Sequence, residues 1–191
     1  LVTGAGSGMG AATAKALADR GARVAVVDLN LESAQQTADS IKGLALAADV
    51  SSSESVEAAL QQVVDELGAP RVVVSCAGIA AASRIVGREG PHELDLYQRV
   101  INVNLVGTFN VLRLTAERMS LLEPVSKSGA RGVIVNTASV AAYDGQIGQA
   151  AYSSSKGGVV ALTLPAAREL ARFGIRVMTV APGLIGTPML L

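Results

Sequence analysis

A tyrosine and a lysine four positions apart, Tyr152 and Lys156, are the pair in this chain best spaced to move a proton together. On a helix, side chains at that spacing lie on one face, so their polar ends can meet. A phenol is a poor acid or base at neutral pH, but a neighbouring ammonium favours the phenolate and lowers the phenol pKa. The spacing predicts a proton-transfer pair; chance placement on an ordinary helix is the alternative that the pair alone leaves open.

A serine stands thirteen positions before the tyrosine, at the end of an apolar run over residues 132–139. The run is typical of a buried strand. At its end, the hydroxyl of Ser139 can hydrogen-bond a substrate carbonyl beside the tyrosine. We therefore expect one strand and the following helix to bring three polar side chains to a common point.

The amino-terminal stretch predicts a site for a dinucleotide. A short strand over residues 1–3 leads into a glycine-rich turn, residues 4–10, and then into a helix over residues 11–20. In this order the backbone N–H groups and the helix N-terminus can receive a pyrophosphate, since glycines leave the approach open. A plain tight turn is the alternative that the glycines alone leave open.

An acidic residue, Asp28, ends the next strand, 18 positions after Gly10. This is close to the roughly 20 expected for a carboxylate that binds the adenosine ribose hydroxyls. A carboxylate there repels a 2′-phosphate, and no basic residue adjoins it, so we expect NAD and not NADP. A plain strand end is the ordinary alternative for Asp28.

Strand and helix patterns alternate along the rest of the chain. We predict strands over residues 43–48, 71–78 and 174–181, helices over 31–42, 51–67 and 94–122, a surface loop over 79–93, and a helix after Gln149 that Pro165 kinks or splits. This alternation predicts a single domain over residues 1–191, an α/β fold of the Rossmann type. Its doubly wound parallel sheet has helices on both faces and a site at the carboxyl ends of the strands.

Asn104 interrupts the helix predicted over residues 94–122. A buried asparagine needs hydrogen-bond partners, and together with Gly107 it predicts a bound water or a backbone distortion near the site. An asparagine that faces solvent is an equally acceptable reading of the pattern.

Composition argues against several functions. Sixteen basic residues balance sixteen acidic ones without blocks of like charge, so we expect no nucleic-acid or membrane partner. The apolar runs are too short for a membrane span. Cys76 is the only cysteine and His92 the only histidine, so we expect no internal disulfide and no metal site. A reducing compartment follows, the cytoplasm or, in a eukaryote, the mitochondrial matrix.

Together these residues resemble the short-chain dehydrogenase/reductase family over essentially the whole chain. The Thr-Gly-x-x-x-Gly-x-Gly opening is Thr3 to Gly10, Asn-x-x-Gly is Asn104 to Gly107, Tyr-x-x-x-Lys is Tyr152 to Lys156, and Pro-Gly-x-x-x-Thr is Pro182 to Thr187. One departure is that the usual Asn-Asn-Ala-Gly reads Ser75 to Gly78, with Cys76 as its second residue. Longer runs, such as residues 132–188, are similar to members that act on 3-hydroxyacyl-CoA.

The resemblance implies roles for individual residues. Tyr152 is the general acid/base, Lys156 lowers the tyrosine pKa and holds the nicotinamide ribose, Ser139 positions the substrate oxygen, and Asn104 completes a water-linked proton relay. Cys76 is a pocket wall without redox chemistry, and Gln149 joins Ser139 and Tyr152 at the substrate. With Tyr152 and Lys156, the cofactor residues are Gly4, Ser7, Gly8, Met9, Gly10, Asp28, Asp49, Val50, Cys76, Ala77, Gly78, Pro182, Gly183, Ile185 and Thr187.

The resemblance also implies a reaction. We expect an NAD-dependent enzyme that interconverts short or 2-methyl-branched 3-hydroxyacyl-CoA and 3-oxoacyl-CoA. The alternatives are a 3-oxoacyl carrier-protein reductase, a hydroxysteroid or small-alcohol dehydrogenase and, remotely, a cofactor-binding scaffold without turnover. It further implies a fragment of a longer chain, incomplete at both ends and cut before its last strand, that assembles as a homotetramer or homodimer when complete.

Overall fold

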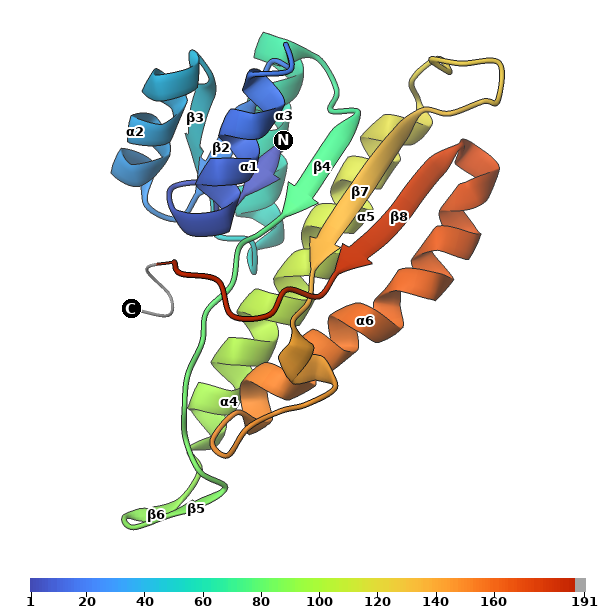
Figure 1. The fold of residues 1–191 in the computed structure, drawn as a ribbon. Coiled ribbons are helices and arrows are strands. Elements are labelled where there is room, and N and C mark those ends of the chain that lie inside the picture. Colours follow the sequence, from blue (N-terminus) through green and yellow to red (C-terminus); the bar gives the residue numbers. More distant parts are fainter. Residues whose placement is uncertain (188–191) are drawn as a thin grey trace.

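A single parallel sheet forms the centre of the computed structural model, which describes residues 1–187 (Figure 1). Its strand order is β3-β2-β1-β4-β7-β8, so the chain starts near the middle, winds to one edge and returns to build the other. The predicted doubly wound sheet is confirmed. The strands are β1 (Val2–Thr3), β2 (Ala25–Asp28), β3 (Leu44–Ala47), β4 (Val72–Ser75), β7 (Gly132–Thr137) and β8 (Ile175–Val180).

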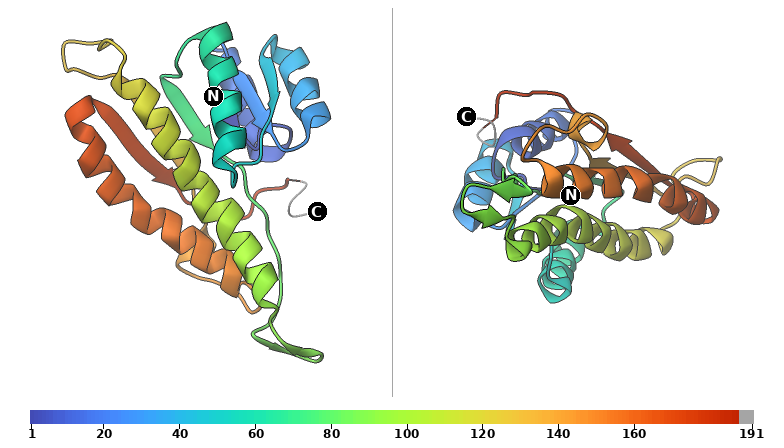
Figure 2. Two further views of the ribbon diagram at one scale, coloured as in Figure 1. Left: turned by 180° about the vertical axis from the view of Figure 1, so that it is seen from behind. Right: turned by 90° about the horizontal axis from the view of Figure 1, so that it is seen from below.

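Helices cover both faces of the sheet, as the alternation predicts (Figures 1 and 2). On one face α1 (Gly8–Ala18) and α2 (Leu31–Ile41) bury alanines against Val2 and Val26. On the other face lie α3 (Ser53–Leu67), α5 (Gly107–Ser120) and α6 (Ala150–Leu170), and the core there includes Val73 and Ile134. Successive strand residues point to opposite faces, so buried β-branched side chains supply two cores from one sheet.

The predicted long helix before β7 is continuous but changes its winding near the site. It begins as α4 (Leu94–Ile101), passes through a π-helical turn, η1 (Asn102–Val106), and continues as α5. A π turn inserts an extra residue into an α-helix and is frequently found at functional sites. The backbone distortion predicted at Asn104 is therefore confirmed.

The local structure differs from the prediction in two places. Helix α6 continues through Pro165 without a split. The lost hydrogen bond is that of the Ala161 carbonyl four residues earlier, and both residues are exposed, so water can bond the carbonyl. The loop predicted over residues 79–93 contains an antiparallel hairpin, β5 (Val86–Gly87) with β6 (Gly90–Pro91). Two-residue strands are too short to give a periodic pattern.

Candidate active site

Two adjoining cavities open at the carboxyl ends of the strands, where the topology places the site. Gly78, just after β4, lines both of them. We name them the substrate cavity and the adenosine cavity, after the residues predicted for each. Predicted site residues that line the substrate cavity are Met9, Cys76, Gly78, Ser139, Gln149, Tyr152, Lys156, Pro182, Gly183, Ile185 and Thr187. Those that line the adenosine cavity are Gly4, Asp28, Asp49, Val50, Ala77 and Gly78.

Tyr152 and Lys156 project from the first turns of α6 into the substrate cavity. The Lys156 ammonium lies 5.7 Å from the centroid of the Tyr152 ring. Its Nζ also donates a 2.8 Å hydrogen bond to the carbonyl oxygen of Thr137, the last residue of β7. Helix and sheet together thus fix the lysine beside the tyrosine, as the spacing predicts.

Burial sets the protonation of the lysine. Lys156 is only 5% exposed, and this desolvation lowers its pKa to about 8, an effect that interaction with Cys76 opposes. At neutral pH the group remains mostly an ammonium. Burial in turn raises the pKa of the Cys76 thiol, although a hydrogen bond from Thr137 and the Lys156 charge act against the rise. Cys76 is therefore a neutral wall of the cavity, in keeping with its predicted role.

Ser139 follows the end of β7 and caps the short 3₁₀ helix η2 (Val140–Ala142). Its Oγ accepts a 3.1 Å hydrogen bond from the N–H of Ala141, which fixes the rotamer. The hydroxyl hydrogen is left to donate into the cavity. Tyr152, Lys156 and Ser139 consequently converge on one space from two elements.

Asn104 does not line either cavity but lies fully buried behind the wall. Its Oδ1 accepts a 2.8 Å hydrogen bond from the N–H of Ile79, while its Nδ2 donates to the Ile79 carbonyl and to Ser155 Oγ. The alternative of a solvent-facing asparagine is excluded. Asn104 joins the π turn, the segment after β4 and helix α6 at the level of Lys156.

The glycine-rich turn is packed too tightly for side chains. A Cβ at Gly10 would lie 2.1 Å from the carbonyl oxygen of Gly4, and one at Gly4 would lie 2.6 Å from the backbone nitrogen of Ala77. Gly4 also has a φ of +61°, which favours glycine. The N-terminus of α1 therefore lies directly against the end of the sheet, the arrangement that receives a pyrophosphate.

Asp28 is held in place by the same turn. Its Oδ2 accepts a 2.9 Å hydrogen bond from the N–H of Gly6, and its Oδ1 accepts one of 3.0 Å from the N–H of Asn30. Asp49 is fixed by Ser51, whose N–H and hydroxyl both donate to Oδ1. The two carboxylates thus stand at the adenosine cavity with set orientations.

Other predicted residues are placed differently. Ser7 is the N-cap of α1, Gly8 and Gly10 lie in the first turn of that helix, and none of the three lines either cavity. His92 stands just before α4, with its Nδ1 near the carbonyl oxygen of Glu93, and within residues 1–187 no cluster of potential ligands could hold a metal.

Sequence reasoning missed part of the substrate cavity, namely Ala80, Ala81, Ala82, Thr137, Ala138, Val140, Ala141, Asp144, Gln146 and Leu184. Most are small apolar residues of irregular segments, which carry no chemical signal. Thr137 acts through its backbone carbonyl, which no side-chain pattern reveals.

The family is established by comparison with known proteins. A family model described as short chain dehydrogenase matches residues 1–191, and the chain belongs to this family. It is 54% identical to 3-hydroxyacyl-CoA dehydrogenase type-2 of Bos taurus, over 100% of this chain and 74% of the relative. It is 41% identical to (3R)-3-hydroxyacyl-CoA dehydrogenase of Homo sapiens, over 99% of this chain and 74% of the relative.

A solved structure gives the same assignment of fold. The crystal structure of 3-hydroxyacyl-CoA dehydrogenase type-2 from Mycobacterium avium superimposes with a TM-score of 0.93 at 40% identity, and the match covers 99% of this chain and 75% of that one. Within the described residues, the helices are all too short or too polar to cross a membrane.

Proposed function

We propose that this protein is an NAD-dependent oxidoreductase that interconverts 3-hydroxyacyl-CoA and 3-oxoacyl-CoA. The observation that carries the proposal is the convergence of Tyr152, Lys156 and Ser139 on one cavity at the ends of the strands. The acyl-CoA part of the proposal is supported by relatives named 3-hydroxyacyl-CoA dehydrogenase at 41–54% identity.

The cavity residues fit a nicotinamide dinucleotide. The glycine-rich turn carries no side chains that would keep a pyrophosphate away from its backbone N–H groups. The oriented carboxylates of Asp28 and Asp49 line the adenosine cavity. Bound there, the nicotinamide would supply the hydride for reduction and accept it in the reverse direction. Tyr152 and Lys156 at the substrate cavity, with Met9 and Thr187, are the residues that would hold the nicotinamide half.

The chain's own residues supply orientation and the proton. The Ser139 hydroxyl donates a hydrogen bond to the substrate oxygen and fixes it beside the phenol of Tyr152. That phenol gives a proton to the oxygen when a 3-oxoacyl group is reduced and takes it back in the reverse direction. The Lys156 ammonium, 5.7 Å from the centroid of the ring, places a positive charge beside the oxygen of Tyr152 that gives up the proton during reduction. Asn104 keeps the wall behind the lysine in place.

The first experiment is reduction of acetoacetyl-CoA, followed by the absorbance of NADH and of NADPH in parallel. Oxidation of NADH supports the proposal. A preference for NADPH favours a carrier-protein reductase. If neither cofactor is consumed, a panel of steroids and small alcohols is tested next. Because one relative is named for the (3R) isomer, the reverse reaction is run with (3S)- and (3R)-3-hydroxybutyryl-CoA. We expect the L isomer, (3S), to be oxidised faster.

Cofactor choice is predicted to depend on the charge of Asp28. We expect Asp28→Asn to lower the preference for NADH over NADPH, as a ratio of kcat/KM values, by about 10- to 100-fold, since like charges in contact cost several kcal/mol. Asparagine keeps one oxygen for the N–H of Gly6 and loses only the acceptor for the exposed N–H of Asn30, so the glycine turn is retained.

Asp144→Asn, an acid of the substrate cavity, is the matched control and leaves the cofactor preference unchanged. An unchanged ratio in Asp28→Asn would show that another group selects the cofactor.

A further inference from the structure

A buried asparagine of α5, Asn110, is tied to one wall of the adenosine cavity. It is 5% exposed and lines neither cavity itself. Its Nδ2 donates a 2.9 Å hydrogen bond to the carbonyl oxygen of Val50, which lines the adenosine cavity beside Asp49. Within residues 1–187, no backbone N–H donates to that carbonyl. The side chain of Asn110 therefore takes the place of a backbone partner.

The segment that Asn110 holds is irregular. Residues 48–51 line the adenosine cavity, and we call them its floor segment. They lie between the end of β3 at Ala47 and the start of α3 at Ser53. The N–H of Ala48 bonds to β2, and Ser51 bonds back to the carboxylate of Asp49. Neither bond involves Val50, so the middle of the floor segment is fixed from α5.

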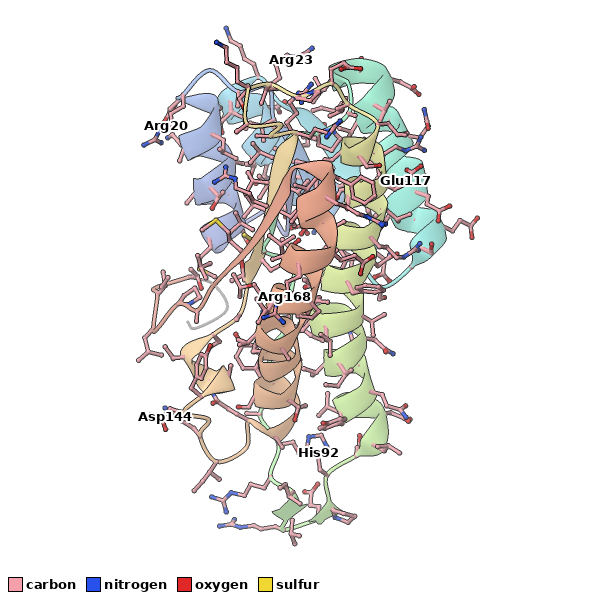
Figure 3. The ribbon with its side chains drawn as sticks, turned by 90° about the vertical axis from the view of Figure 1, so that its right-hand side faces the viewer. Arg20, Arg23, His92, Glu117, Asp144 and Arg168 are labelled. Atoms are coloured by element: carbon pink, nitrogen blue, oxygen red, sulfur yellow. The ribbon has the colours of Figure 1, made fainter. Side chains whose placement is uncertain are left out.

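Helix α5 also packs directly against Val50. A Cβ at Gly107, three residues before Asn110, would lie 2.6 Å from Cγ2 of Val50. Figure 3 shows α3 beside α5, so α5 contacts both the floor segment and the helix that follows it. Val50 is thus held at two points, its side chain by the contact with Gly107 and its carbonyl by the hydrogen bond from Asn110.

The orientation of the Asn110 amide is set by Arg113, one turn further along α5. Nε and Nη2 of Arg113 donate to Asn110 Oδ1 over 3.2 and 2.8 Å, and Nη2 also donates a 2.6 Å hydrogen bond to Ser53 Oγ at the start of α3. Because an arginine can only donate, the amide oxygen must face it and Nδ2 must face Val50. One buried amide therefore joins α5, α3 and the floor segment.

We propose that Asn110 is a positioning residue for the adenosine half of the dinucleotide and acts through Val50. The inference rests on the proposed function, which places the adenosine in this cavity. A wall that is already ordered costs no ordering free energy when the ligand binds. Without the hydrogen bond from Asn110 the floor segment is free to move, so the affinity for the adenosine half falls. Tyr152 and Lys156, in the substrate cavity, keep their places.

The test compares two cofactors that differ in the adenosine half. NADH and reduced nicotinamide mononucleotide, which lacks that half, are titrated by nicotinamide fluorescence, and rates of acetoacetyl-CoA reduction give KM and kcat. We expect Asn110→Leu to raise Kd and KM for NADH about tenfold, since binding must then order the floor segment. We expect kcat, and Kd for the mononucleotide, to change less than about twofold, because the substrate cavity is untouched.

Thr115→Val is the matched control. Thr115 is a fully buried residue of the same helix, and its hydroxyl bonds within α5 to the carbonyls of Val111 and Leu112. The control should leave the binding of both cofactors unchanged. Arg113→Gln is a second variant, at a partly exposed position where folding is less at risk. It loosens the Asn110 amide and should raise Kd for NADH about threefold.

Two results overturn the inference. Equal effects of Asn110→Leu on both cofactors would show general damage to the fold, and an unchanged Kd for NADH in both variants would show that the floor segment needs no support from α5. A wild type that binds NADH but reduces no thioester refutes the proposed function, while the titrations still decide the role of Asn110.

Discussion

Tyr152→Phe is expected to lower kcat for acetoacetyl-CoA reduction by about 10²- to 10⁴-fold, the usual contribution of a positioned general acid. The substitution removes one hydroxyl and keeps the ring that lies 5.7 Å from Lys156 Nζ. Cofactor affinity should fall far less than kcat, because the glycine turn, Asp28 and Asp49 still hold the adenosine half and only the hydroxyl of Tyr152 is lost from the residues around the nicotinamide half. The measurement pairs steady-state rates with a titration of NADH fluorescence.

Tyr143→Phe is the control for this experiment. Tyr143 directly follows η2, in the segment that leads to α6 and Tyr152, but it is 73% exposed and does not line the substrate cavity. Its hydroxyl has no expected role, so the variant should match the wild type. If Tyr152→Phe kept more than about a tenth of the wild-type rate, Tyr152 would not be the proton donor. If it lost NADH binding together with activity, the effect would be structural.

The fold was predictable because local signals agree with one another. Ser52 caps α3, because its Oγ accepts a hydrogen bond from the N–H of Ser55. The run of serines before this helix predicts where the helix begins. The apolar runs became strands, since buried parallel strands need apolar side chains on both faces. The side chains of the site were predictable because parallel strands bring their carboxyl ends to one edge of a sheet.

What could not be predicted depends on the backbone and on irregular segments. The carbonyl of Thr137 holds Lys156, yet every residue has a carbonyl. Asn104 was a candidate from its sequence position, but its partners, Ile79 and Ser155, lie 25 and 51 residues away along the chain. Long-range pairs of this kind follow from the fold and leave no local pattern.

The hairpin β5–β6 was missed for a different reason. Its strands have two residues each, and its side chains Ile85, Val86 and Arg88 are exposed instead of alternating between core and solvent. Strand patterns arise from packing against a core, so an element outside the core has none.

Lys156→Met is expected to abolish most activity and yet to stabilise the protein without cofactor by about 2 kcal/mol at pH 7. Burial lowers the pKa of Lys156 from 10.5 to about 8. Each pKa unit corresponds to about 1.4 kcal/mol, so the buried charge costs roughly 3 kcal/mol. Methionine removes that cost, but the loss of the hydrogen bond to Thr137 destabilises the variant by about 1 kcal/mol. Urea unfolding measures the difference, and acetoacetyl-CoA reduction measures the loss of activity.

The pH dependence of the stability gain distinguishes removal of the buried charge from better packing by methionine. Below pH 8 the lysine is charged in both the folded and the unfolded state, so the wild type bears the full cost of burying the charge. Between pH 8 and pH 10.5 the unfolded chain binds more protons than the folded one, so wild-type stability rises with pH. The advantage of Lys156→Met must then shrink over this range, whereas a packing effect would stay constant. Lys15→Met, at an exposed position of α1, should show neither the gain nor its pH dependence.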